Sequence, residues 1–456
     1  MKHFWAKNAA AWLVVIMLMP LWGLFIWVET FDHRTPPTLP GNTPAAATTE
    51  NGGEGVDGSV GFDVGASTDN TPTSIPDRFI PDREQDRLAT PRPAPSTLTL
   101  DGPGPHNIPA GVWSASIDAV DGLTILCDEG AVFDGLGTLQ HFVQGSADDV
   151  TIDGCEVTNY ASRDPGGGMS SQYGAINARQ PGPEPAPLDT QGVNWTLSNL
   201  HVHNNAGGGV LLSSGSTLTD SRIVDNADFG CTSHGGSRIQ IVGNEFARNG
   251  HGWADNPGQQ WNESGGCKLK HVTGSDDGPT VVHSNVFKDS VGPAIWCDID
   301  CVDLMVTRNR IGGPTGSCVF IELSKDATVR NNVCDQAGSV NRGWFWEAGI
   351  MVAGSQRVTV TGNRVSRSYN GITVISQDRY DQDTLELRDD WRTDQITVSG
   401  NQIVGCQFSG VAHGDNNDPI VEDAPNGPDG VFADPDVFNR VTWTDNEISD
   451  CEEVLQ

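Results

Sequence analysis

The sequence predicts an all-β fold, a parallel β-solenoid assembled from short repeated units. Apolar-alternating runs recur with an Asn-x-apolar signature, and 54 Gly and 27 Pro residues punctuate the chain. The signature asparagines are Asn244, Asn285, Asn309, Asn332, Asn363, Asn401 and Asn446. The same slot extends backward to Ser221, Asn199 and Gly154, which gives about ten coils with shortest spacings of 22 to 24 residues. Units of this length without regular Leu spacing favour a β-solenoid over a leucine-rich repeat.

An apolar run precedes the repeats at the N-terminal end. Residues 9–28 are apolar throughout, and Lys2 and Lys7 come before them. Because about 20 apolar residues suffice to cross a bilayer, residues 1–34 are predicted to be a retained transmembrane signal anchor. Positive charge on the N-terminal side places that end in the cytoplasm. The expected localisation is therefore a single-pass membrane protein whose C-terminal domain is extracellular or periplasmic.

The segment between the anchor and the repeats has the composition of a spacer. Residues 35–98 are rich in Pro, Thr and Gly and show almost no apolar periodicity. Such composition predicts a disordered linker. Residues 99–456 are then the solenoid domain.

The charge of the chain excludes one class of partner. The 456 residues carry 27 Lys plus Arg against 59 Asp plus Glu, a net charge of -32. A protein that grips nucleic acid through its phosphates needs the opposite balance. Four lysines follow residue 34, and two of them, Lys268 and Lys270, lie side by side on one predicted strand.

A second strand in each repeat can be aligned from coil to coil. Its segments are GVLLS, GCTSH, GCKLK, AIWCD, CVFIE, GIMVA, GITVI and GVAHG, which begin at residues 209, 230, 266, 294, 318, 349, 371 and 410. The second and fourth positions are mostly apolar and should face the core, so the third and fifth should face outward. The fifth column contains Ser213, His234, Lys270, Asp298, Glu322, Ala353, Ile375 and Gly414. The third column contains Leu211, Thr232, Lys268, Trp296, Phe320, Met351 and Thr373.

These columns predict a shallow groove suited to a sugar polymer. We assign catalytic roles to the charged side chains at its centre, namely Asp298, Glu322, Lys270 and Lys268. Trp296 and Phe320 offer flat faces to sugar rings and are assigned to substrate binding. The two carboxylates lie on adjacent coils, so each should raise the other's affinity for a proton. A glycoside hydrolase would use them as acid and base, whereas a lyase would use a lysine on a uronate carboxylate or its neighbouring proton.

Three weaker candidates for substrate binding surround this strip. They are His234, Glu263 and Asp300, which the alignment places beside or just before the charged columns. The alternative interpretation is an exposed ladder in which Lys270 simply neutralises Asp298 and Glu322. A neutral glycan and an acidic glycan that docks at the lysines are both compatible with the charge of the chain.

Several segments resemble the right-handed parallel β-helix proteins of the pectate-lyase-like superfamily. They are PAGVWSASIDAVDGLTILCDEGAVFDG, VTIDG and VTVTGN, which begin at residues 109, 150 and 358. The resemblance implies a single-stranded right-handed parallel β-helix for about residues 105–456. GGCK, IWCDID and FIELS are similar to GGxK, LWxDID and FHEIS segments of relatives, with Ile321 in place of the His. Because the superfamily holds lyases, hydrolases, epimerases, tail spikes and non-enzymes, the resemblance does not settle the reaction.

The cysteines predict disulfides. Cys231 and Cys267 occupy one inward slot of successive coils, and Cys406 and Cys451 each lie five residues after a signature asparagine. Ten cysteines in an exported chain without paired CxxC spacing favour bridges over a metal site, and we assign no metal ligands.

An acidic stretch raises the question of a cation. Residues 414–436 could hold calcium through their oxygens, although they lack the spacing of a calcium loop, so a solvated loop is the default. No cofactor is otherwise indicated.

Two hypotheses of function follow. The first is a membrane-tethered enzyme that degrades polysaccharide in the groove, as a lyase or a glycoside hydrolase. The second is a non-catalytic β-helix that binds a glycan or a cell-surface partner through the aromatic strip. The expected partners are a polysaccharide and, through the N-terminal helix, a membrane, but no nucleic acid. The oligomeric state is not indicated by the sequence.

Overall fold

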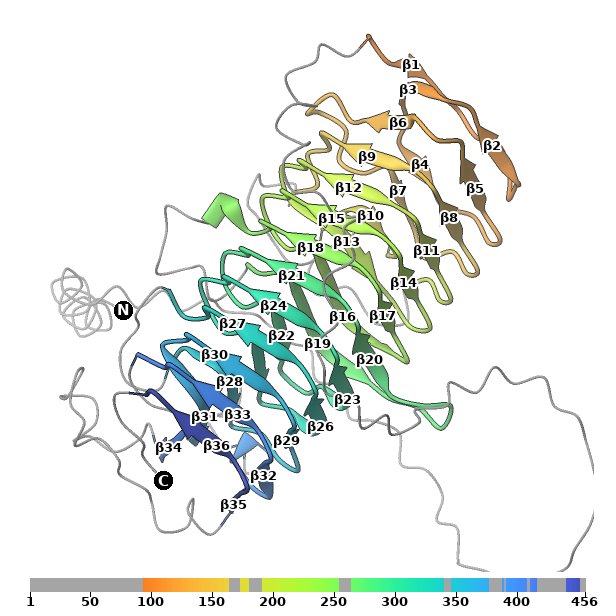
Figure 1. The fold of residues 1–456 in the computed structure, drawn as a ribbon. Helices are drawn as coiled ribbons and strands as arrows, with labels where there is room; N and C mark the ends of the chain where they lie inside the picture. The colour runs from red at the N-terminus through yellow and green to blue at the C-terminus, as the bar shows by residue number, and fades with distance from the viewer. Residues whose placement is uncertain are drawn as a thin grey trace, which may run out of the picture. The chain divides into compact units, whose positions relative to one another are not determined.

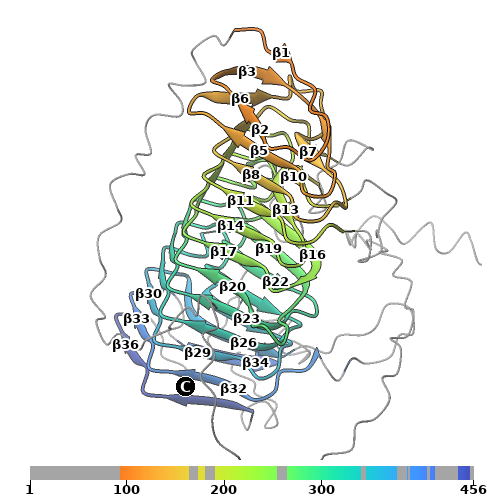
Figure 2. The same cartoon turned by 90° about the vertical axis from the view of Figure 1, so that its right-hand side faces the viewer.

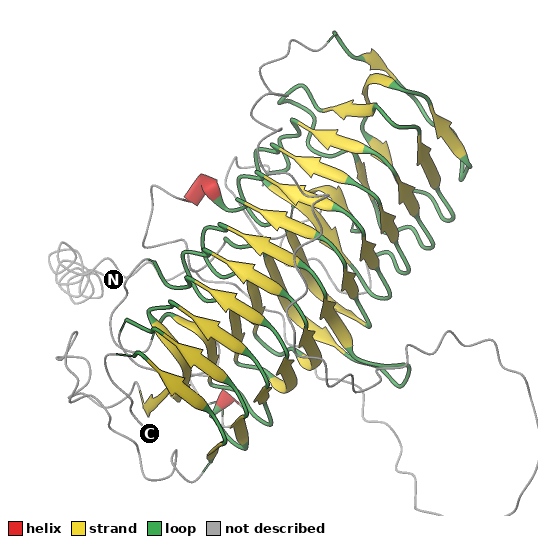
Figure 3. Ribbon diagram, in the orientation of Figure 1, coloured by secondary structure: helices red, strands yellow, loops and turns green. Residues whose placement is uncertain are grey.

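The computed structural model describes residues 93–163, 173–179, 191–253, 264–339, 346–376, 388, 391–407, 411–415 and 440–451. These residues form stacked coils of short parallel strands (Figure 1). Strands and turns make up nearly all of the described chain (Figure 3). A short 3-10 helix, η2, spans His251–Trp253. The expected all-β parallel fold is confirmed.

Each coil contributes strands to three faces. Face 1 consists of β4 (Ile117–Asp118), β7 (Val143–Gln144), β10 (Gly174–Asn177), β13 (Gly208–Leu212), β16 (Cys231–Ser237), β19 (Cys267–Thr273), β22 (Ile295–Asp298), β25 (Val319–Glu322), β28 (Ala348–Ala353), β31 (Asn370–Ser376) and β34 (Val411–Asp415). Face 2 consists of β2 (His106–Ile108), β5 (Thr124–Cys127), β8 (Thr151–Asp153), β11 (Thr196–Ser198), β14 (Thr217–Thr219), β17 (Gln240–Val242), β20 (Thr280–His283), β23 (Val302–Thr307), β26 (Lys325–Arg330), β29 (Thr359–Thr361), β32 (Ile396–Ser399) and β35 (Val441–Thr444). Figure 2 shows the stacked strands of face 2.

Face 3 is a separate sheet, whereas faces 1 and 2 are joined into one 23-stranded sheet. Face 3 consists of β1 (Ser96–Thr97), β3 (Gly111–Ser114), β6 (Ala131–Asp134), β9 (Glu156–Thr158), β12 (His201–His203), β15 (Arg222–Val224), β18 (Glu245–Ala247), β21 (Val286–Lys288), β24 (Arg310–Gly312), β27 (Val333–Asp335), β30 (Arg364–Ser366), β33 (Gln402–Val404) and β36 (Glu447–Ser449). With 13 strands described on this face, the stack has more coils than the expected ten or so.

The core lies inside the coils and follows the period of two along each strand. On face 1, the inward positions hold Val210 and Leu212 in β13 and Ile295 and Cys297 in β22, all fully or almost fully buried in the main apolar cluster. Alternate residues point to opposite sides of a strand, so the same apolar positions repeated on every coil make one continuous core. The sequence alignment of face 1 therefore had the correct register.

A ladder of asparagines connects the coils at the turn between faces 2 and 3. The side-chain oxygen of each accepts a hydrogen bond from the backbone N–H of the asparagine one coil earlier, at 2.9 to 3.1 Å. The ladder runs through Asn244, Asn285, Asn309, Asn332, Asn363, Asn401 and Asn446. The residue before each has a positive φ, as in Arg308 (57°), so the chain turns sharply and the amide points inward.

The backward extension of this slot was partly wrong. Ser221 does occupy it, because its N–H donates to Asn244 and its hydroxyl accepts from Leu200. Leu200, not Asn199, is therefore the slot residue of the preceding coil. Gly154 is the equivalent of Asn199 in the preceding coil, so it also comes one residue before the slot. Asn199 and Gly154 take the positive-φ position that precedes the slot, where Asn and Gly are both favoured.

All ten cysteines form disulfides. The predicted pairs Cys231–Cys267 and Cys406–Cys451 are present. The others are Cys127–Cys155, Cys297–Cys301 and Cys318–Cys334. The preference for bridges over metal ligation by cysteine is thus confirmed.

The predicted anchor and most of the predicted linker lie outside the described residues, which start at residue 93. Within the described ranges, no helix has the length and apolar character needed to cross a membrane.

We expect Asn309→Ala to destabilise the fold strongly. The Asn309 amide accepts from Asn285 and donates to the carbonyl of Val282, and both partners would be left buried without it. Each such group costs roughly 1–3 kcal/mol, so the free energy of unfolding should fall by at least about 2 kcal/mol. Urea unfolding measures this. Asn446→Ala, at the partly exposed end of the ladder, is the matched control and should cost less; equal losses would contradict a role for burial.

Candidate active site

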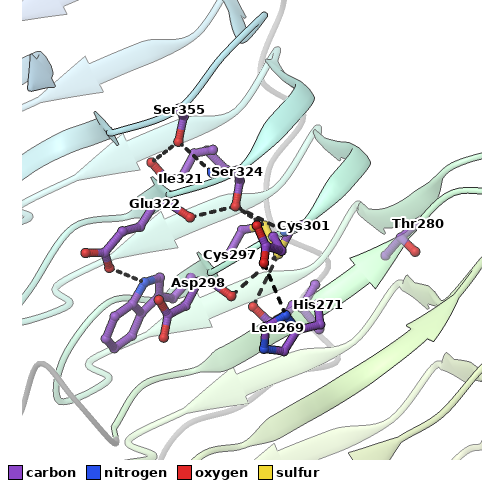
Figure 4. Close-up of a disulfide and its surroundings, with 12 residues drawn as sticks. Leu269, His271, Thr280, Cys297, Asp298, Cys301, Ile321, Glu322, Ser324 and Ser355 are labelled. Carbon is purple, nitrogen blue, oxygen red and sulfur yellow. Dashed lines mark hydrogen bonds and ion pairs between the residues drawn. A yellow bond between two sulfur atoms is a disulfide. The ribbon is translucent and has the colours of Figure 1, made fainter. Parts of the chain in front are cut away.

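The charged columns come together on face 1 in the predicted register. Lys270 lies opposite Asp298, which lies opposite Glu322 on the next strand. His234 lies opposite Lys270 on the other side. Figure 4 shows Asp298 and Glu322 projecting to one side of their strands, while the Cys297–Cys301 disulfide lies on the other.

The expectation of an exposed shallow groove was wrong. No more than 9% of the surface is exposed for any of the six central residues, Lys268, Lys270, Asp298, Glu322, Trp296 and Phe320. Trp296 and Phe320 nevertheless stand outside the main apolar cluster, as outward-facing residues should. The period of two fixes the side to which a side chain points, but it does not say what covers that side. The exposed-ladder alternative is wrong about exposure for the same reason, but the ion pairing of lysine with Asp298 that it predicted is present.

Asp298 is held by both lysines. Its Oδ2 lies 3.1 Å from Lys268 Nζ and 3.8 Å from Lys270 Nζ. Burial by itself would raise the pKa of Asp298, but the two ammonium groups outweigh it and the pKa lies below its usual value of 3.8. The expected rise in the pKa of Asp298 from Glu322 is therefore not seen, because Lys268 and Lys270 favour the ionised carboxylate. Asp298 is an ionised group that orders two cations, and it is unsuited to act as an acid.

Aromatic rings form the second column beside this ion pair. Lys268 Nζ lies 3.8 Å from the centre of the Trp296 ring, which stacks on Phe320 at 5.5 Å. The Trp296 Nε1–H donates to Glu322 Oε2 at 3.2 Å. The indole thus touches a cation through its face and a carboxylate through its edge, as the ring quadrupole favours. Lys268 and Glu322 are fixed relative to one another by this ring.

His234 is an uncharged imidazole at neutral pH. Burial by the surrounding protein lowers its pKa well below the usual 6.5, and the positive charges of Lys270 and Lys268 lower it further. Arg179 adds to the same effect. A neutral imidazole has a nitrogen lone pair that can accept a proton, which makes His234 a candidate general base, although the neighbouring cations weaken its basicity. It was assigned only to substrate binding from the sequence.

Two polar residues of face 1, Arg179 and Asn177, were not predicted from the sequence. Ile176 lies opposite Val210, so Arg179 falls in the fifth column and Asn177 in the third, one coil before the first aligned segment. Extending the alignment to GAINAR at 174 would have found both. Asn177 Oδ1 and Thr232 Oγ1 are buried and have no hydrogen-bond partner. Such groups are rare unless a ligand or water satisfies them.

Asp300 forms a separate cluster. It sits in the turn after β22 with φ of 53° and accepts a hydrogen bond from Trp391 Nε1 at 3.0 Å. His271 Nδ1 and Arg388 Nη2 lie 3.8 and 3.7 Å from its oxygens. Asp300 is therefore tied to these partners rather than to the ion pair of Asp298.

Two predicted elements cannot be placed. Glu263 lies outside the described residues, as do residues 416–436 of the acidic stretch considered for calcium. Within the described part of face 1, the lysines already neutralise Asp298, so this carboxylate is a poor cation ligand.

Comparison with known proteins identifies the repeat. Residues 188–365 match the family model described as "Right handed beta helix region". Residues 188–365 thus form a right-handed β-helix region, in agreement with the parallel strands of the three faces. No curated protein matches the chain.

Solved structures similar to this chain include polysaccharide-active enzymes. The A-module of a mannuronan C-5 epimerase from Azotobacter vinelandii is 13% identical, with 79% of this chain and 89% of that chain covered and a TM-score of 0.42. The catalytic unit of a GH87 α-1,3-glucanase from Streptomyces thermodiastaticus is 13% identical, with 77% and 64% covered and a TM-score of 0.42. At such values neither likeness bears on the activity of this chain.

Asp298→Asn should remove a pH-dependent part of the stability. Because the folded-state pKa of Asp298 lies below 3.8, its stabilisation is fully present above that value and is lost as pH falls through the folded-state pKa. The difference in unfolding free energy between wild type and Asp298→Asn should therefore be largest near neutrality and shrink in acid. Urea unfolding at a series of pH values measures it. Asp277→Asn, at an exposed ion pair, should change the unfolding free energy little at any pH. If the difference between wild type and Asp298→Asn did not vary with pH, Asp298 would not be the ionised partner of the lysines.

Proposed function

We propose that this protein is a polysaccharide-active enzyme that acts on an acidic glycan at the outward columns of face 1. The observation that carries the proposal is the position of Lys268, Lys270 and His234 on two neighbouring strands of face 1, with Arg179 in the same outward column as His234, in a chain whose net charge is -32. A cationic spot in an acidic protein selects an anionic group at that spot while the rest of the surface repels polyanions. A uronate carboxylate is the anion that a sugar polymer supplies.

The arrangement favours elimination over hydrolysis. Lys268 and Lys270 would neutralise the uronate carboxylate, which acidifies the adjacent C–H. His234 would take that proton, the bond to the glycosidic oxygen would break with formation of a carbon–carbon double bond, and Glu322 would give a proton to the leaving oxygen. Asp298 would hold the two lysines in place. A hydrolase would instead need two available carboxyl groups, one as acid and the other as base or nucleophile, whereas Asp298 is held by Lys268 and Lys270.

Non-catalytic glycan binding is the second candidate. Its support is the ion pair of Lys268 with Asp298, because a lysine that already neutralises a carboxylate contributes less to acidifying a substrate C–H bond. In that case the glycan would bind without product formation.

We further propose that the enzyme is tethered at a cell surface. The apolar run at residues 9–28 has the length of one membrane crossing, and five disulfides belong in an oxidising compartment. Alkaline extraction of membranes should leave the protein in the pellet, and deletion of residues 1–34 should release it. Release of the full chain by alkali would oppose the tether.

The activity is tested with a panel of neutral and uronate polysaccharides. Wild type should release products with ultraviolet absorbance of an unsaturated uronate, and Lys268→Met should lower kcat/KM by about 10²-fold or more. Lys288→Met removes the same charge from face 3 and should not change the rate. New reducing ends without that absorbance would indicate hydrolysis. Binding without either product would establish the non-catalytic alternative.

The pH profile tests the role of His234. A general base works when deprotonated, and the pKa of His234 lies well below 6.5, so kcat/KM should hold steady from neutral pH to below 6.5 and fall only in more acidic solution. His234→Gln should lower the rate by about 10²-fold or more. His283→Gln, a half-buried histidine of face 2, is the matched control. An acidic limb at or above pH 6.5 would contradict the proposed base.

A further inference from the structure

A cluster of imidazole and carboxylate groups lies on face 3. Glu156 is in β9, and His201 and His203 are in the neighbouring β12, with His201 directly opposite Glu156. Val157 and Val202 between them are fully buried in the core. Alternation along the two strands therefore sends Glu156, His201 and His203 to the outer side.

The ligand atoms of these three residues converge. They all lie within 4.8 Å of one another, and no other such group of three occurs among the described residues. His203 Nε2 is 3.1 Å from Glu156 Oε1, and the two imidazole rings stack with centroids 4.1 Å apart. Nitrogen and oxygen ligands about 2.0–2.2 Å from a zinc ion lie roughly 3 to 4 Å from each other, so side-chain rotations suffice to surround one ion.

Hydrogen bonding orients the His203 ring. Its Nδ1 lies 2.6 Å from the side-chain oxygen of Asn204, and its Nε2 faces Glu156 Oε1 at 3.1 Å. An imidazole that carries its proton on Nδ1 keeps a lone pair on Nε2, the atom that a metal ion would bind. A metal ion between Nε2 and Glu156 would have one nitrogen and one oxygen ligand in place. An oxygen acceptor behind Nδ1 is also the usual way to orient a metal-binding histidine.

We propose that Glu156, His201 and His203 bind a divalent transition metal ion of the zinc type. Two imidazoles and one carboxylate suit such an ion, whereas calcium and magnesium prefer oxygen ligands alone. Three protein ligands leave a position for water. The ion would link β9 to β12 and so bridge successive coils on face 3.

The neighbouring charges are compatible with such an ion. Arg222 lies opposite His201 on the following strand, but its Nε donates to Glu245 Oε2 at 3.0 Å, so its charge is paired one coil further along. On the preceding strand the residue opposite Glu156 is Val132, which brings no charge.

The test uses the full chain without a histidine tag, stripped with a chelator and titrated with zinc sulfate in a calorimeter. Wild type should bind one equivalent, and His201→Gln should bind at least tenfold more weakly. His283→Gln removes a histidine from face 2 and should bind as wild type does. X-ray absorption at the zinc edge of the loaded wild type should show two imidazole ligands with oxygen completing the shell.

Two results would overturn the proposal. Absence of stoichiometric zinc binding by wild type would identify the contact of His203 with Glu156 as an imidazolium–carboxylate ion pair. Unchanged affinity in a folded His201→Gln variant, as judged by circular dichroism, would place the ion elsewhere. If His201→Gln does not fold, the absorption spectrum of wild type decides, since a shell without imidazole contradicts the site.

Discussion

The backbone hydrogen bonds between successive coils are the interaction on which the rest of the structure depends. They hold equivalent residues of neighbouring strands opposite one another, and the asparagine ladder fixes the same register at the turn. Every column of side chains follows from this stacking. A functional group placed once per coil meets its neighbours about 4.8 Å away, without any loop to position it.

The stacking creates two kinds of buried side chain on face 1. Inward positions such as Leu269 and Ile321 build the apolar core, whereas outward positions such as Lys268 and Trp296 are buried outside it. In the outer layer, low exposure strengthens the attraction between Lys268 and Asp298 and lowers the pKa of His234. An ionised carboxylate and a neutral imidazole thus occur two strands apart. Under the proposed function, His234 would accept a proton while Asp298 stays ionised and holds the lysines.

The sequence predicted the coils and the register but not the surroundings of the charged residues. Period-two alternation and the signature asparagines are local patterns, so face 1 and two disulfides followed from them. The burial of Lys268 depends on what covers the strip. The lowering of the pKa of Asp298 by two lysines depends on distances between coils. The ladder position was wrongly placed at Asn199 because two adjacent turn positions both accept Asn, and the sequence does not distinguish them. Glu156 and His201 are 45 residues apart, so only pairing of β9 with β12 reveals their meeting.

The proposed function requires the outward columns of face 1 to bind a uronate. The most direct measurement is a crystal structure of the folded His234→Gln variant grown with a saturating acidic oligosaccharide. We expect a sugar carboxylate within hydrogen-bond distance of Lys268 or Lys270, with a ring against Trp296 or Phe320. An oligosaccharide bound on another face, or an intact Lys268–Asp298 pair with no sugar beside it, would rule out this site.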